Sequence, residues 1–231
     1  YAITVRLVGS EMCIRDSLEA IRRNWPIEDI ASLSKVDLWF LREIEKSFNV
    51  NPESTPVSIL KMLGWTDEDL DSKEIKDDLE NKRAYKLVDT CSAEFLSKTP
   101  YLYSTFGTSD DDSASKNKKV VVIGSGPNRI GQGIEFDYCC VHGVESLKEN
   151  NYEAIMINSN PETVSTDYDT ADKLYFEPLS WDEVKAVLAR EKPDSVIIQL
   201  GGQTPLKLAD KISSAGYKIA GSSLDVIDAT E

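Results

Sequence analysis

The sequence has little of what many catalytic, metal-binding and nucleic-acid-binding sites require. It contains a single histidine, His142, and four cysteines, none with the CxxC or Cys/His spacing of a zinc site. Basic residues are few: the sequence has 26 Lys and Arg residues against 40 Asp and Glu residues, which gives a net charge of -14. Nucleic acids and anionic membranes are bound through basic patches, so we expect neither partner.

Long hydrophobic runs are also missing, which bears on where the protein works. No apolar run approaches the roughly 20 residues that cross a bilayer, so we expect no membrane span. With no disulfide framework in the cysteine spacing, we expect reduced thiols and a cytoplasmic protein.

The first 17 residues stand apart from the rest. Residues 1–17 show neither a clear helical nor a clear strand period, and they lack the long apolar core of a secretory signal. The string RLVGSEMCIRDS, at residues 6–17, resembles a translated sequencing-adapter artefact found at the ends of gene fragments. We therefore interpret residues 1–17 as a non-native leader, with a genuine N-terminal strand as the alternative.

Residues 18–106 carry helical signals but no cluster of chemically active residues. Pro26 suits the first turn of a short helix, and Ser34 can cap the helix that follows. The highly charged stretch 67–85 has a thin apolar stripe, which indicates surface helices. We predict a helical domain of oligomerisation type over residues 18–106, with a structural role.

A polar segment follows the helical region. Residues 107–117 are mostly Ser, Asp and Lys, and residues 110–112 are three consecutive aspartates that repel one another. Such a segment offers little to bury, so we predict a linker or an exposed loop over residues 107–117.

From residue 118 onward, short β-branched runs alternate with helical patterns. This alternation is typical of a parallel, doubly wound sheet. We predict strands over residues 119–123, 153–158, 195–200 and 217–220, and helices over residues 130–150, 181–191 and 204–215. The fold class is therefore α/β, with a helical N-terminal domain followed by a Rossmann-like parallel-sheet domain over residues 118–231.

Three polar loops follow the first three of these strands, and parallel strands would bring them to one edge of the sheet. The first is glycine-rich and opens a helix, whose free N–H groups favour an anion. The second, residues 158–169, is rich in amides, hydroxyls and carboxylates, and the third spans residues 199–205. The polar residues of a single loop are usually explained by turn formation and helix capping. Three such loops at one edge of the sheet favour a ligand site. No nucleophile–base pair accompanies them, so the site suits guiding a small polar molecule.

A dinucleotide site is the first alternative for the glycine-rich loop. Gly124 and Gly126 match the first two glycines of GxGxxG, but the third position is Arg129. The second strand ends at Asn158 instead of the acidic residue that would bind a ribose. These two departures weaken the hypothesis of a Rossmann-like nucleotide-binding regulator. We keep it as an alternative, together with a non-catalytic oligomerisation module.

Three long strings in these loops resemble the second, carbamoyl-phosphate-forming half of the carbamoyl phosphate synthetase large subunit. They are SGPNRIGQGIEFDYCCVH at residues 125–142, NSNPETVSTDYDTADKLYFEP at residues 158–178 and GGQTPLKLA at residues 201–209. Upstream, residues 88–95 and 101–106 resemble the end of the family's helical oligomerisation domain. The resemblance covers about residues 18–231 and identifies residues 118–231 with a pre-ATP-grasp domain.

The resemblance implies an ATP-dependent carbon–nitrogen ligase. The family makes carbamoyl phosphate from bicarbonate, glutamine-derived ammonia and two ATP, for pyrimidine or arginine biosynthesis. Implied partners are a glutaminase subunit or domain, the rest of the large chain, and further copies of the same chain. ATP and magnesium would bind mainly to the family's ATP-grasp module, which follows this region. We therefore expect no catalytic residue, metal or cofactor in this chain alone.

The family also passes carbamate between its two halves through an internal tunnel, which protects an intermediate that decomposes in water. Gly133 matches a tunnel position and would keep it open, while Arg129 could hold the carbamate anion or pair with a glutamate. A purely structural ion pair is the alternative for Arg129. The expected tunnel or active-site wall residues are Asn128, Arg129, Gln132, Gly133, Glu135, Asn158, Asn160, Glu162, Thr163, Gly201, Gly202, Gln203 and Thr204.

Overall fold

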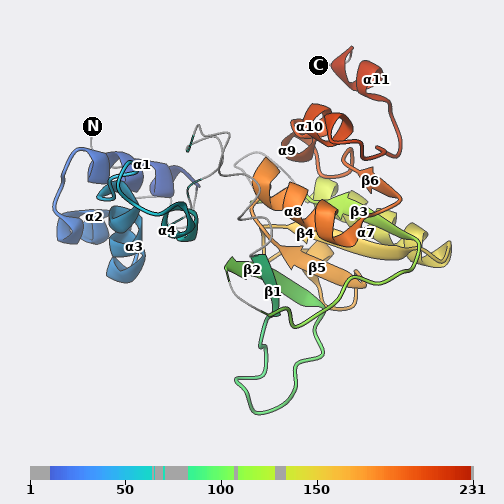
Figure 1. Cartoon of the computed structure of the whole chain (residues 1–231), viewed down its shortest axis with the longest axis horizontal. Helices are drawn as coiled ribbons and strands as arrows, with labels where there is room; N and C mark the ends of the chain where they lie inside the picture. Colours follow the sequence, from blue (N-terminus) through green and yellow to red (C-terminus); the bar gives the residue numbers. More distant parts are fainter. Residues whose placement is uncertain are drawn as a thin grey trace. The chain divides into compact units, whose positions relative to one another are not determined.

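The computed structural model describes residues 11–63, 65, 70, 83–106, 109–127 and 134–229 of the chain. The chain forms two compact units, Tyr1–Asn81 and Lys82–Glu231. Figure 1 shows the helices of the first unit in blue and the sheet of the second in green to orange.

The first unit is helical, as the sequence predicts. The helices in its described residues include α1 (Glu11–Arg22), α2 (Ile27–Ser34), α3 (Leu38–Phe48) and α4 (Val57–Met62). Ile30 and Leu41 are fully buried at its centre. Pro26 is the N-cap of α2, so it lies just before the first turn in which it was predicted. The cap of α3 is Asp37, whose side chain accepts a hydrogen bond from the Trp39 N–H, so the prediction that Ser34 caps this helix is wrong.

Part of the supposed leader belongs to this unit. Residues 11–17 lie within α1, and Ser17 is buried at 1% exposure. The helix extends upstream because residues 11–17 contain neither glycine nor proline to interrupt it. The absence of a clear hydrophobic period therefore did not exclude a helix over residues 11–17. Residues 1–10 of the predicted leader lie outside the described residues.

The second unit is built on a six-stranded sheet. The strands are β1 (Arg83–Leu87), β2 (Tyr101–Phe106), β3 (Lys119–Ile123), β4 (Glu153–Asn158), β5 (Lys173–Phe176) and β6 (Ser195–Ile197). Their order is β1-β2-β5-β4-β3-β6, with β1 and β2 antiparallel and the other pairs parallel. The predicted α/β fold with a mostly parallel sheet is confirmed.

Helices cover both faces of this sheet. They are α7 (Glu135–Glu149), the 3-10 helix η1 (Val164–Thr166), α8 (Trp181–Glu191), α9 (Gln203–Leu206), α10 (Ala209–Ser214) and α11 (Leu224–Asp228). Successive residues of a strand point to opposite faces. Val122 accordingly packs with Val144 of α7, whereas Val121 packs in the cluster that contains Leu188 of α8. The two crossover helices therefore lie on opposite faces, as in a doubly wound sheet.

The structure corrects the predicted boundary between the two domains. β1 and β2 fall within residues 18–106 but join the sheet instead of the helical unit, and Tyr85 in β1 is buried at 3% exposure. β5 had no predicted counterpart. The strand-like pattern of residues 101–106 matches β2, whereas β1 and β5 were missed because each is stabilised by partners distant in sequence, such as the pairing of Tyr175 with Leu102.

Three predicted elements near the C-terminus are also revised. Residues 217–220 form only an isolated bridge, Val196 to Ile219, and the strand predicted over 195–200 ends at Ile197. The single helix predicted over 204–215 is two short helices, α9 and α10. By contrast, the strands over 119–123 and 153–158 and the helix over 181–191 have the predicted bounds.

The acidic segment before β3 is not a free linker in its described part, residues 109–117. Each consecutive aspartate pairs with its own cation: Asp110 with Arg190 at 2.8 Å, Asp111 with Lys86 at 2.9 Å, and Asp112 with Lys173 at 2.6 Å. Backbone N–H groups of β1 also donate to the aspartates. The segment thus covers the free edge of β1. It can lie there because cations remote in sequence neutralise the charges of its three aspartates.

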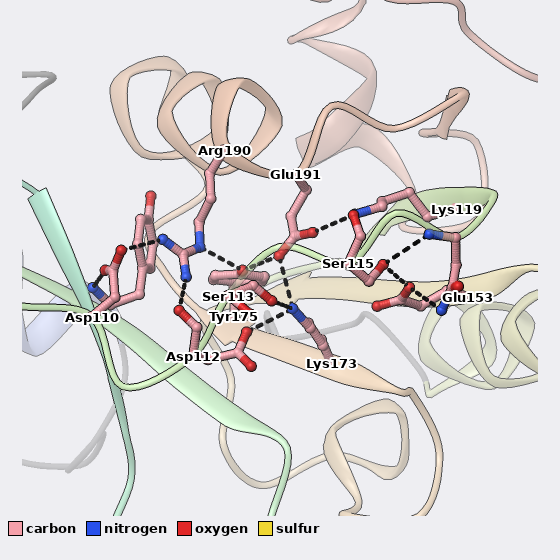
Figure 2. A network of polar contacts seen from close by, with 12 residues as sticks. Asp110, Asp112, Ser113, Ser115, Lys119, Glu153, Lys173, Tyr175, Arg190 and Glu191 are labelled. Atoms are coloured by element: carbon pink, nitrogen blue, oxygen red, sulfur yellow. Dashed lines mark hydrogen bonds and ion pairs between the residues drawn. The ribbon is translucent and has the colours of Figure 1, made fainter.

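A buried ionic cluster lies at the amino ends of β3 and β5 (Figure 2). The Glu191 carboxylate is fully buried and lies 2.9 Å from the Lys119 ammonium, itself 3% exposed, and 3.3 Å from Lys173. The Tyr175 hydroxyl donates to the same carboxylate. Burial opposes ionisation of Glu191, but the hydrogen bonds from Tyr175 and Lys119 and the lysine charges outweigh it. The pKa of this carboxyl therefore lies below its usual value.

Candidate functional site

The order of the strands singles out one place on the sheet. The chain passes from β3 to β4 and β5 on one side, then crosses by α8 to β6 on the other side of β3. The loops after β3 and β6 therefore diverge at a topological switch point. In open α/β sheets, ligands bind outside the carboxyl ends of the strands at such a point.

The loops after β3 and β6 touch there through glycine. A Cβ atom on Gly201 would lie 2.6 Å from the Ile123 carbonyl oxygen and 2.7 Å from backbone atoms of Gly124. Gly202 adopts a φ of +72° and lies against the Phe136 ring at the start of α7. Only glycine allows this close approach, so the expected site residues Gly201 and Gly202 fix the spacing of the two loops.

The loop after β4 is joined to the loop after β3 by Asn158, another expected site residue. Its side chain is fully buried. The amide oxygen accepts from the Gly126 N–H at 3.1 Å and from the Asn160 N–H at 3.3 Å, and Nδ2 donates to the Ser165 hydroxyl at 3.2 Å. The loop after β3 thus contacts both of the other polar loops that were predicted to share this edge of the sheet.

A second polar group supports Asn158 from α7. The Asp137 carboxylate, 2% exposed, accepts from the Ser165 backbone N–H at 2.8 Å and from the Ser165 hydroxyl. We did not predict Asp137 or Ser165 as site residues. One signal was present in the sequence, because Asp137 shares a helical spacing with the buried residues Cys140 and Val144.

The remaining described site residues lie around this core. The Asn160 side chain is half-buried and accepts from the Glu162 N–H at 3.0 Å, while the Glu162 side chain is exposed. Glu135 is exposed at the first position of α7. Thr163 is half-buried, and its carbonyl accepts from the Thr166 hydroxyl at 2.7 Å. Gln203 is exposed and Thr204 half-buried in the first turn of α9.

Four expected site residues lie outside the described residues: Asn128, Arg129, Gln132 and Gly133. They belong to the loop between β3 and α7, whose described ends are residues 124–127 and 134. Their roles therefore remain predictions.

The chemistry of the described loops is that of neutral hydrogen bonding. Across the described segments, no group of three or more His, Cys, Asp or Glu side chains could hold a metal ion. The Gly126 N–H, which a dinucleotide phosphate would need, already donates to Asn158. This bond counts against the dinucleotide alternative. Such loops can shape a passage for a small polar molecule.

In the described segments, no helix is long and apolar enough to cross a membrane.

Comparison with known proteins gives a consistent answer. Residues 116–229 match the family model of the carbamoyl phosphate synthase preATP-grasp domain. A carbamoyl phosphate synthase large chain of Archaeoglobus fulgidus is 44% identical over 235 residues, covering 92% of this chain and 22% of the relative. The large chain of Clostridium acetobutylicum is 46% identical over 231 residues, covering 92% and 22%. That of Deinococcus radiodurans is 44% identical over 234 residues, covering 93% and 23%. The chain thus spans about a fifth of the length of these relatives.

Proposed function

Since the chain belongs to the carbamoyl phosphate synthase large-chain family and contains its preATP-grasp domain, we propose that it is part of an enzyme that makes carbamoyl phosphate. The substrates would be bicarbonate, ammonia released from glutamine, and two ATP. In this proposal, the three loops at the switch point form a wall of the second active site and of the passage that delivers carbamate to it.

The observation that carries this proposal is the contact among the three loops. Buried Asn158 joins two of them, and the glycine contact at Gly201 joins the third. Nearby surfaces suit contact with further protein, because large apolar side chains are exposed on α7 and beside η1. They include Ile134 at 67%, Tyr138 at 55% and Tyr168 at 67% exposure. Exposed apolar patches mark interaction surfaces, here assigned to the rest of the large chain.

The partners and cofactors of the proposal lie outside this chain. A glutaminase subunit or domain would supply ammonia, and an ATP-grasp module would bind ATP and magnesium. The helical unit would contribute to self-association of the large chain, and the enzyme would work in the cytoplasm for pyrimidine or arginine synthesis.

Replacing Gly133 with leucine tests the passage in the whole synthase. We expect Gly133→Leu to lower carbamoyl phosphate formation by about a hundredfold, because a branched side chain would narrow the route for carbamate. Glutamine hydrolysis should largely survive, since ammonia is released elsewhere. Both rates are measured on the same enzyme preparation, and equal loss of both would contradict the proposed passage.

The isolated chain is expected to be inactive. Purified residues 1–231 should neither hydrolyse ATP nor form carbamoyl phosphate, because the ATP-binding residues of the proposal are on another module. The measurement is phosphate release and carbamoyl phosphate formation with bicarbonate, ammonia and magnesium–ATP. Turnover that copurifies with this chain would overturn the assignment of its residues to a wall.

A further inference from the structure

Asp137 lies at one end of a buried series of hydrogen bonds that reaches the loop after β3. Asp137, Ser165 and Asn158 are 2%, 0% and 0% exposed. Ser165 donates its hydroxyl and its backbone N–H to the carboxylate. Asn158 donates its Nδ2 to the Ser165 hydroxyl oxygen at 3.2 Å, and its amide oxygen accepts from Gly126 at 3.1 Å. The series thus connects α7, η1, the end of β4 and the loop after β3.

The carboxylate at one end and the backbone N–H groups at the other fix the direction of every bond in the series. An ionised carboxylate only accepts hydrogen bonds, so the Ser165 hydroxyl proton points to Asp137. The Ser165 oxygen is then an acceptor for its other neighbour, and only the Nδ2 end of Asn158 can donate to it. The amide oxygen of Asn158 must therefore face the opposite way, toward the backbone N–H groups of the two loops.

We propose that Asp137 is a positioning residue for the candidate site, which acts through Ser165 to orient the Asn158 amide and so hold the loops after β3 and β4 together. Its role in catalysis rests on the proposed function, because that proposal assigns these loops to the second active site. Asp137 contacts the loop after β4 at Ser165, and it reaches the loop after β3 only through Ser165 and Asn158. Its effect on the reaction is transmitted by the two buried side chains.

Substituting Asp137 with asparagine breaks the series with little change of shape. Asparagine offers one acceptor oxygen where the carboxylate offers two, so one of the two Ser165 donors loses its partner. A buried donor without an acceptor is costly, and the Ser165 hydroxyl can then turn toward Asn158 and compete with its donor end. The variant thus removes the carboxylate's contribution to the Asn158 orientation, which the N–H groups of Gly126 and Asn160 alone then hold.

Amide hydrogen exchange in this 231-residue chain tests the series directly. We expect the Gly126 N–H to exchange about tenfold faster in Asp137→Asn and in Ser165→Ala than in the unsubstituted chain. Glu149→Gln, an exposed carboxylate on the same helix, is the matched control and should leave the Gly126 rate unchanged. Protection at Val122 in β3 reports that the sheet is intact. If Asp137→Asn does not fold, the exchange rate of the Gly126 N–H in Ser165→Ala tests the proposal instead. An unchanged Gly126 exchange rate in the variants that fold overturns the proposal.

Activity of the whole synthase tests the positioning role. Asp137→Asn should lower carbamoyl phosphate formation about tenfold to a hundredfold through displaced loops, with glutamine hydrolysis near its original rate and the Glu149→Gln control unaffected. Faster Gly126 exchange with undiminished carbamoyl phosphate formation overturns the positioning role. A failure of the proposed function can be told apart from a failure of the positioning role. In that case Gly133→Leu would leave the rate of carbamoyl phosphate formation unaffected, while Asp137→Asn would still speed Gly126 exchange.

Discussion

Glu191→Gln is expected to lower the free energy of unfolding of the sheet unit by about 3–5 kcal/mol, the usual cost of removing one partner of a buried ion pair. The substitution would remove the negative charge and leave one neutral acceptor oxygen for Lys119, Lys173 and Tyr175. The Lys119 ammonium, 3% exposed, would keep the Ser115 carbonyl oxygen at 2.8 Å. Urea unfolding followed by near-ultraviolet circular dichroism gives the difference. Asp111→Asn is the control, because Asp111 pairs with Lys86 at the exposed surface, where an ion pair contributes little.

The same substitution carries a pH signature. The pKa of Glu191 in the folded chain lies below its unfolded value, so its contribution to stability is present above the unfolded pKa, about 4.3. That contribution is lost as the pH falls through the folded pKa, because protonation then removes the charge. The difference in stability between the unsubstituted chain and Glu191→Gln should therefore shrink as the pH falls below about 4. A difference that stays constant with pH would assign the effect to packing instead of charge.

Gly201→Ala is expected to have the second large effect, on both stability and activity. The added methyl would lie 2.6 Å from the Ile123 carbonyl oxygen, and backbone atoms cannot rotate away. We expect a loss of about 1–3 kcal/mol in unfolding free energy from this overpacking. In the whole synthase, displacement of the loop after β6 should lower carbamoyl phosphate formation by about a hundredfold.

A second glycine provides the control for Gly201. In Gly143→Ala the new methyl meets only the end of the Leu200 side chain, which can rotate, and alanine is the better helix former by about 1 kcal/mol. Thermal unfolding and carbamoyl phosphate formation should therefore change little in Gly143→Ala. Equal effects of the two substitutions would show that the backbone contact at the switch point is not what makes Gly201 sensitive.

Much of the candidate site could be predicted from the sequence, because its loops follow strands with a strong local pattern. Asn158 was expected at the end of a β-branched run, and the structure brings it against Gly126 of the preceding loop. Asp137 was not expected, since a carboxylate near the start of a helix is usually exposed there and favoured by the helix dipole. Its burial depends on Ser165, 28 residues away.

The boundary between the two units shows the limit of local patterns. Residues 83–87 follow a charged stretch and give no strong strand signal alone, yet they pair with residues 102–106 in β2. The three aspartates at 110–112 repel one another as an isolated segment. In the folded chain each one faces a different cation, of which Arg190 lies 80 residues away.

The sequence by itself determined the fold class, the central strands β3 and β4, the helix α8 and the loops that follow the strands. These features depend on periodicity and turn residues within a few positions of one another. Only the tertiary structure decided that β1, β2 and β5 complete the sheet, that the aspartates are paired, and that Asp137 orients Asn158 through Ser165. Those features depend on groups brought together from distant positions, where burial removes competing water and makes each polar partner specific.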